Sequence, residues 1–202
     1  MCRNITGQNW KGQDDNMKTA TVKLKSISPY AQSRHYVDPP RGDRESPADY
    51  EKRTWRERMH YDENGEVFIP PMSLKNSITE AAVFLGHKIP GKRNATWSKH
   101  FLAGILVTDA VGLGVKKDDV PGQWLFLPSD GKKGGGSRVD KCFGRIDAWE
   151  GQATYYILDE TITKDVFMEH LKEAGQFIGI GFFRPRNGGY WGRYSSELLK
   201  WE

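Results

Sequence analysis

The stretch between residues 152 and 183 has three segments: Gln152-Ala-Thr-Tyr-Tyr-Ile-Leu158, Thr163-Lys-Asp-Val-Phe-Met-Glu-His-Leu-Lys-Glu-Ala-Gly175, and Phe177-Ile-Gly-Ile-Gly-Phe-Phe183. The first and last are rich in aromatic and β-branched residues, which is typical of strands. The middle segment begins with a threonine suited to an N-cap and ends at a glycine, a common helix stop. The pattern predicts a strand, a helix and a second strand, and residues 190–201 are expected to add a closing strand.

The first ninety residues predict a similar alternation. Residues 19–28 alternate between apolar and polar side chains, which indicates a strand with one buried face. A long loop over residues 29–45 leads to Ser46-Pro47, an N-cap followed by proline, and to a helix over residues 47–59. A short strand over residues 66–69 precedes a second helix over residues 72–85, whose apolar residues recur at helical spacing and therefore belong to the core.

Together these elements predict an α+β fold, a ferredoxin-like or RNA-recognition-motif-like antiparallel sheet with two core helices. We expect a flexible tail over residues 1–17 and a single domain over residues 18–202. Insertions are expected at about 30–65 and 87–137. An OB barrel is the alternative, but two core-facing helices are more than such a barrel needs.

Composition narrows the class of protein. The chain has 202 residues, a formal net charge of +4 and 12% aromatic residues. So many aromatic residues argue against disorder, and a mildly basic chain is compatible with nucleic acid. Two isolated cysteines form neither a disulfide framework nor a zinc site. The sequence shows no apolar signal core and no apolar run of about 20 residues, so we expect a cytoplasmic protein without a membrane span.

The glycine-rich segment near the end of the chain has the residues needed to hold a polyanion. Its arginines can pair with phosphates, its glycines let backbone N–H groups approach closely, and its aromatic rings offer stacking faces. The candidate residues are Arg184, Arg186, Tyr190, Trp191 and Arg193. The alternative is a glycine-rich hairpin with packed aromatic rings and solvated arginines.

Two other places carry candidate phosphate ligands. Lys75 and its neighbour Asn76 lie in the first turn of the 72–85 helix, and a helix N-terminus with a lysine beside it favours anions. Lys92 and Arg93 lie in a basic loop over residues 88–99. A solvated lysine in the first turn explains Lys75 about equally well.

Three motifs, in order, resemble those of a known family. They are Ile27-Ser-Pro-Tyr-Ala-Gln-Ser33, Ile69-Pro-Pro-Met-Ser-Leu-Lys-Asn-Ser-Ile78, and Ile178-Gly-Ile-Gly followed by Gly188-Gly-Tyr-Trp-Gly-Arg-Tyr194. The chain resembles the RAMP superfamily of CRISPR effector proteins, most closely the backbone subunits that polymerise along guide RNA. Pro71 and Asn76 stand where the family's helix motif has glycines.

The resemblance implies a function in antiviral defence. It implies that Lys75 and the glycine-rich loop contact RNA, and that Arg34 and His35, which follow the first strand, contact the RNA backbone. The implied partners are single-stranded guide RNA, other CRISPR effector subunits and further copies of the chain in a filament. No cofactor and no metal is implied.

Some backbone subunits of this family cleave RNA with an acidic residue in the loop after the first strand, where this chain has Asp38 and Asp43. A loop aspartate is far more often a turn-former, so we predict a non-enzymatic RNA-binding protein. Three alternatives remain: a single-stranded DNA-binding protein of a virus or mobile element, an inhibitor that mimics a CRISPR backbone subunit, and a metal-dependent RNA nuclease.

Overall fold

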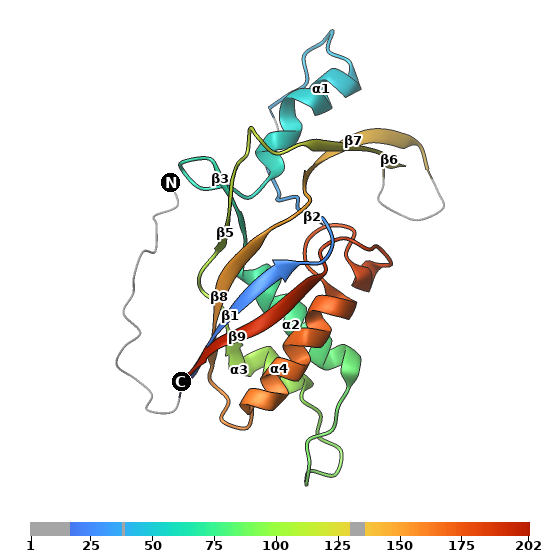
Figure 1. Cartoon of the computed structure of the whole chain (residues 1–202). Coiled ribbons are helices and arrows are strands. Elements are labelled where there is room, and N and C mark those ends of the chain that lie inside the picture. Colours follow the sequence, from blue (N-terminus) through green and yellow to red (C-terminus); the bar gives the residue numbers. More distant parts are fainter. Residues whose placement is uncertain (1–16, 38, 130–135) are drawn as a thin grey trace.

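The fold is built on a four-stranded antiparallel sheet with the strand order β4-β8-β1-β9. The computed structural model describes residues 17–37, 39–129 and 136–202 (Figure 1). The elements of the central layer are, in chain order, β1 (Lys18–Ser26), α2 (Pro71–Leu85), β4 (Ile105–Leu106), β8 (Glu150–Ile157), α4 (Lys164–Glu173) and β9 (Tyr194–Trp201). This order along the chain, combined with this order in the sheet, is the ferredoxin-like topology.

One face of the sheet and the two long helices share a core. On β1, Val22 and Leu24 are fully buried, whereas Lys23 between them is only partly buried. They belong to one cluster with Leu74 of α2 and Phe167 of α4. The predicted α+β, ferredoxin-like fold with two core helices is therefore confirmed. Within the described ranges, no helix has the length and apolar composition needed to cross a bilayer.

A second group of elements lies beyond the end of the central sheet. A curved strand, β7 (Arg138–Ile146), pairs with β2 (Tyr30–Ala31) near one end and with β6 (Gly122–Pro128) along the rest of its length. The β6–β7 hairpin lies beside α1 (Pro47–Thr54) and the 3-10 turn η1 (Trp55–Arg58), as Figure 1 shows. Other connections contain β3 (Glu66–Ile69) paired with β5 (Val111–Lys116), and α3 (Ser98–Gly104).

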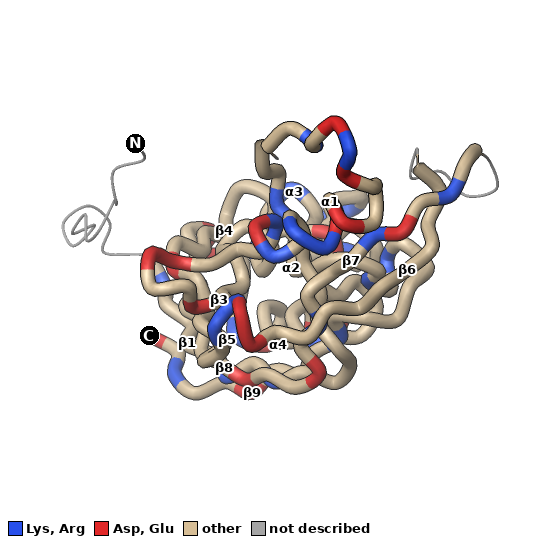
Figure 2. The backbone as a smooth tube through the Cα atoms, turned by 90° about the horizontal axis from the view of Figure 1, so that it is seen from above, with Lys and Arg blue, Asp and Glu red and all other residues tan. Residues whose placement is uncertain are grey.

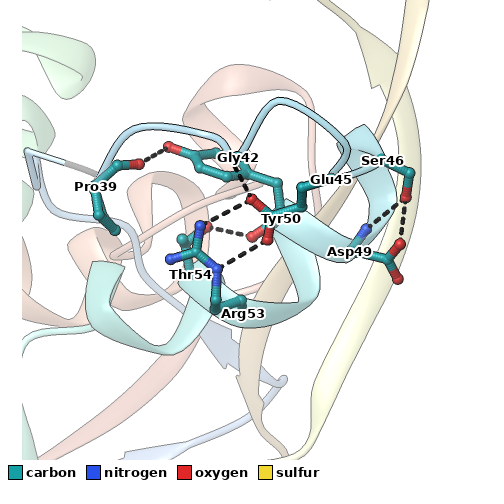
Figure 3. Close-up of polar contacts among 8 residues, drawn as sticks. All are labelled: Pro39, Gly42, Glu45, Ser46, Asp49, Tyr50, Arg53 and Thr54. Atoms are coloured by element: carbon teal, nitrogen blue, oxygen red, sulfur yellow. Dashed lines mark hydrogen bonds and ion pairs between the residues drawn. The ribbon is translucent and has the colours of Figure 1, made fainter.

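Local hydrogen bonds and an ion pair fix the start of α1 and the loop before it (Figure 3). The Ser46 hydroxyl accepts a hydrogen bond from the Asp49 N–H at 3.1 Å, so the predicted N-cap is confirmed. Arg53 donates through Nε and Nη2 to both oxygens of Glu45, each at 2.9 Å, which ties the preceding loop to the helix. Hydrogen bonds from Arg53 and from the Gly42 N–H lower the pKa of Glu45 to about 2.

The prediction of a strand over residues 177–183 was wrong. The chain continues from α4 into a π-helical turn, η2 (Ala174–Ile178), and then bends at Gly179 and Gly181, both with positive φ. Gly175 does not end a helix. A Cβ there would lie 2.0 Å from the Tyr194 carbonyl oxygen, so this glycine lets β9 approach the helix.

Two strand boundaries also differ from expectation. The apolar run over residues 102–107 predicts a strand, but residues 102–104 lie in α3 and only residues 105–106 form β4. The closing strand begins at Tyr194 rather than at residue 190, because a 3-10 turn, η3 (Pro185–Asn187), and an irregular segment precede it. The glycine-rich segment is therefore a folded loop, and residues 179–193 are called the terminal loop below.

Candidate nucleic-acid interface

Backbone hydrogen bonds join the terminal loop to the segment that follows β1. The Ile27 N–H donates to the Arg193 carbonyl at 2.8 Å, and the Phe182 N–H donates to the Ala31 carbonyl at 2.7 Å. The first and third of the family-like motifs, about 150 residues apart in the sequence, are therefore neighbours in space.

Helix α2, which carries the second motif, also contacts this part of the chain. The hydroxyls of Ser77 and Tyr194 form a buried hydrogen bond of 3.1 Å. Arg184 of the terminal loop donates through Nη2 to Glu80 Oε1 at 2.9 Å. All three motifs thus converge at one end of the central sheet.

Two adjoining cavities form a groove between the terminal loop, α2 and the β6–β7 hairpin. The polar cavity, of ≈ 330 Å³, has a lining that includes His60, Ser73, Asn76, Glu80 and Arg184. The apolar cavity, of ≈ 520 Å³, has a lining that includes Trp55, Leu127, Val139, Phe143 and Phe183. Both cavities share Gln32, Ser33, Gly181, Phe182 and Asn187, so they are continuous.

Charge in the polar cavity is balanced by one carboxylate. Glu80 lies 2.9 Å from Arg184 Nη2 and 3.9 Å from Arg186 Nε. Burial, and then the nearby charge of Arg34, lower the pKa of His60, which favours its neutral form at pH 7. The cationic groups on this wall are therefore the loop arginines, and Glu80 is their present partner.

Of the predicted residues on α2, Asn76 lines the groove and Lys75 does not. Lys75 donates from Nζ to the Leu102 carbonyl of α3 at 3.1 Å. Successive residues on a helix point about 100° apart, so two neighbours rarely face the same surface. If Lys75 and the terminal loop held one RNA strand, the two would share a surface; instead, Asn76 and Ser73 are the residues of the first turns of α2 that reach the groove.

In the terminal loop, the predicted residues divide into structural and accessible ones. Arg193 fastens the loop by donating to the carbonyls of Gln176 and Tyr190, each at 3.1 Å. Trp191 is only 4% exposed and packs edge-on against Phe183, so the prediction that its ring face stacks on bases was wrong. Tyr190 is 63% exposed, and Arg184 lines the polar cavity.

The remaining basic candidates do not line either cavity. Arg34 donates from Nε to the Glu57 carbonyl at 3.1 Å and lies over the Tyr61 ring, while His35 is exposed in the next position. Lys92 and Arg93 are exposed in the loop after α2, at the opposite end of that helix from the groove. A helix of 15 residues is about 22 Å long, and Figure 1 shows this loop at the far end of the molecule.

Of the two acidic candidates, the structure describes only Asp43. Asp38 lies outside the described residues, and Asp43 is exposed in a turn before α1. In the part of the chain that the structure describes, no group of three or more His, Cys, Asp or Glu side chains could hold a metal ion. Figure 2 shows basic and acidic segments alternating along α1 and the loop before it, so this region is not a uniformly basic surface.

Sequence reasoning missed Phe143, Phe182, Gln32 and Asn187 as groove residues. Gln32 lies inside the first motif, and Asn187 lies between Arg186 and Gly188 of the glycine-rich segment, so their positions in the sequence pointed to the site. Phe143 lies on the hairpin, far from every motif in the sequence. Only tertiary packing brings its ring to 4.4 Å from that of Phe182.

Comparisons with known proteins address the fold. No protein-family model and no curated protein matches the sequence. Among solved structures, the crystal structure of Cmr6 from Pyrococcus furiosus is 12% identical with a TM-score of 0.49, over 90% of this chain and 99% of that one. A Cas6 product complex is 13% identical with a TM-score of 0.35, over 88% of this chain and 50% of that one. At identities of 12% and 13%, these likenesses concern the fold alone.

Proposed function

We propose that this chain is a non-enzymatic protein that binds single-stranded RNA in the groove, chiefly through phosphate contacts. The observation that carries the proposal is the convergence of three distant motifs on one groove, with Arg184 and Asn76 on its polar wall. Guanidinium and amide N–H groups are suited to phosphate oxygens. The N–H groups of four glycines in the loop already donate to carbonyls of the protein, so the side chains are the available donors; these glycines are Gly179, Gly188, Gly189 and Gly192. Tyr190, at the exposed surface of the same loop, can stack on a base.

The wider proposal follows from the motif resemblance. We propose that the RNA is a guide RNA, that the chain assembles with other CRISPR effector subunits, and that copies associate head to tail along the RNA. Sedimentation of the protein with RNAs of increasing length tests this last point. The number of bound copies should rise in steps with RNA length, whereas a single copy at every length would contradict filament formation.

Competition separates the proposal from its alternatives. RNA and DNA oligonucleotides of one sequence are titrated against the same labelled RNA complex. Tighter binding of DNA favours a single-stranded DNA-binding protein. Weak binding of both, together with tight binding to CRISPR effector subunits, favours a mimic. RNA cleavage that requires a divalent metal ion and is lost in Asp38→Ala or Asp43→Ala favours a nuclease.

The double variant Arg184→Gln with Arg186→Gln should weaken RNA binding and flatten its salt dependence. Each phosphate contact with a single strand contributes about 0.7 to the slope of log K against log salt concentration, so two lost contacts should reduce the slope by about 1.4. Lys200→Gln is the control, because Lys200 is an exposed cation at the far end of β9. If the double variant keeps the wild-type slope, these arginines do not contact phosphate.

Replacing Glu80 with glutamine should tighten RNA binding by about 2- to 5-fold, the range expected when a partly exposed ion pair no longer competes for the arginines. The carboxylate now lies where a phosphate oxygen would approach Arg184. Glu197→Gln on β9 makes the same change in net charge away from the groove and serves as the control. Weaker binding of Glu80→Gln alone would mean that Glu80 orients Arg184 for phosphate instead of competing with it.

A further inference from the structure

The apolar cavity has a floor of stacked aromatic rings. The rings of Phe182 and Phe143 lie 4.4 Å apart between centroids and are inclined by 22°, an offset-stacked geometry. One ring comes from the terminal loop and the other from the β6–β7 hairpin, so the pair spans the groove. Phe182 lines both cavities and keeps 37% of its surface exposed, which leaves part of the ring open to a ligand.

Strained backbone holds Phe182 in this place. Phe183 has φ of 53°, the only positive φ outside glycine among the described residues. Gly181, on the other side, has φ of 76°, and a Cβ there would lie 2.2 Å from the Ala31 carbonyl oxygen. A bulky residue in the left-handed region is costly and persists only where its surroundings enforce it, a situation that is concentrated at binding sites. The strained backbone at Gly181 and Phe183 therefore suggests that the position of Phe182 between them serves binding.

The polar groups beside the aromatic pair are suited to reading the edge of a ring. Gln32 is 4% exposed and lines both cavities. Its Oε1 accepts from the Tyr30 hydroxyl at 3.1 Å and its Nε2 donates to the His60 carbonyl at 3.4 Å. An amide carries two donors and two acceptor sites, so Gln32 retains one of each. Asn187, exposed at the rim, offers a second amide.

An apolar, aromatic cavity beside a polar, cationic one matches the chemistry of a nucleotide. A nucleobase is flat and suited to stacking, whereas its sugar-phosphate is polar and anionic. The apolar cavity lies next to a polar cavity lined by Arg184 and Asn76. Its volume of ≈ 520 Å³ falls in the range of about 300–1,000 Å³ that is usual for small-molecule sites.

We propose that the apolar cavity is a subsite for one unpaired nucleobase of the bound strand, stacked on Phe182 and hydrogen-bonded at its edge by Gln32. The adjoining phosphate then lies in the polar cavity beside Arg184. This inference rests on the proposed RNA-binding function and adds to it a specific position along the strand where a base leaves its neighbours. Extruding a base costs least when the strand is single, so the subsite also favours unpaired RNA over duplex.

The test uses the wild-type protein and RNA oligonucleotides of the shortest length that binds. Each oligonucleotide carries one abasic position, and the position is moved along the strand. One position should weaken binding about 5- to 150-fold, the equivalent of one base–aromatic stack, while the slope against salt stays unchanged because no phosphate is lost. If every abasic position binds like the unmodified strand, the subsite does not exist.

The variant Phe182→Leu connects that position to the ring. It should bind the unmodified RNA more weakly than wild-type protein does, and the abasic change should then cost the variant less affinity than it costs wild-type protein, because only the hydrogen bonds to Gln32 remain to be lost. Phe177→Leu is the matched control, because Phe177 and Phe84 form another stacked, half-exposed pair away from the groove. A Phe182→Leu protein that loses as much affinity with the abasic strand as wild-type protein does would overturn the assignment of the base to Phe182.

The results of these experiments distinguish failure of the base subsite from failure of the proposed RNA-binding function. If wild-type protein binds RNA with a salt slope that depends on Arg184 but no position is sensitive to base removal, the phosphate site survives and the base subsite fails. If wild-type protein does not bind RNA, both fail. Should Phe182→Leu not fold, judged by circular dichroism, the abasic scan on wild-type protein and a Phe182→Tyr variant that keeps the ring still decide the question.

Discussion

Replacing Glu51 with alanine should destabilise the protein by about 3–5 kcal/mol, the cost of removing one partner from a buried ion pair. Glu51 is only 2% exposed, and it joins α1 to the hairpin. It lies 2.7 Å from Arg58 Nη2 and 3.2 Å from Lys141 Nζ, and it accepts from the Cys142 N–H at 2.9 Å. Urea denaturation followed by circular dichroism measures the change in the free energy of unfolding.

Glu45 provides the control for this prediction. It also pairs with an arginine at α1, but the Arg53 side chain is 46% exposed. Glu45→Ala should therefore destabilise the protein much less than Glu51→Ala does, because exposed ion pairs contribute little to stability. Equal losses for the two variants would mean that burial of Glu51 does not determine the strength of its contacts.

The Glu51 carboxylate should also make the stability of the protein depend on pH. Burial alone would raise the pKa of Glu51, but hydrogen bonds from Arg58, the Cys142 N–H and Lys141 outweigh it and leave the pKa below its ordinary value. A lowered pKa in the folded state adds stability above the ordinary glutamate pKa of about 4.3, and this stability is lost as pH falls through the folded-state value. Glu51→Gln should therefore lose less stability than wild type between pH 7 and pH 3. An equal loss in both proteins would contradict this assignment.

The substitution Gly192→Ala should unfold the terminal loop or destabilise the whole protein by about 2–5 kcal/mol, from left-handed backbone and steric overlap together. Gly192 has φ of 73°, and a Cβ there would lie 1.9 Å from the Ile180 carbonyl oxygen. The Ile180 N–H donates to the Gly192 carbonyl at 3.0 Å, so the two segments of the terminal loop cannot move apart without losing this hydrogen bond. Because this loop forms one wall of the groove, RNA affinity measured by fluorescence anisotropy should fall with the stability.

Gly114→Ala separates the two causes. Gly114 also has positive φ, 65°, but a Cβ there would meet nothing within 4 Å. It should show only the cost of left-handed backbone, about 1–2 kcal/mol, with unchanged RNA affinity. If Gly192→Ala is no worse than Gly114→Ala, the close approach to Ile180 contributes nothing.

Local sequence was enough to predict the elements whose signals lie within a few residues. Ser46 and Thr163 cap helices as expected, and Gly86 ends α2 in the left-handed conformation. The apolar spacing in α2 correctly identified Leu74 and Ile78 as core residues. Caps and amphipathic spacing depend on bonds between residues three or four apart, so they can be read without knowing the rest of the fold.

The glycines near the end of the chain show where local reading fails. Gly175 looks like a helix stop, yet its role is to let the Tyr194 carbonyl approach, and that partner lies in another element. Apolar residues 177–183 look like a strand, yet Gly179 and Gly181 adopt positive φ and bend the chain into the loop. The same composition fits either structure, and only contacts with the segment after β1 select the loop.

The candidate site divides in the same way. Residue type and order along the chain identified the terminal loop, the start of α2 and the segment after β1, because close approach to an anion needs glycine, arginine and helix N-terminal groups wherever they fold. Tertiary packing decided that Asn76 rather than Lys75 faces the groove, and that Phe182 and Phe143 line the apolar cavity while Trp191 is buried. Which face of a helix or ring stays exposed depends on the element packed against it, and that element is distant in sequence for each of these residues.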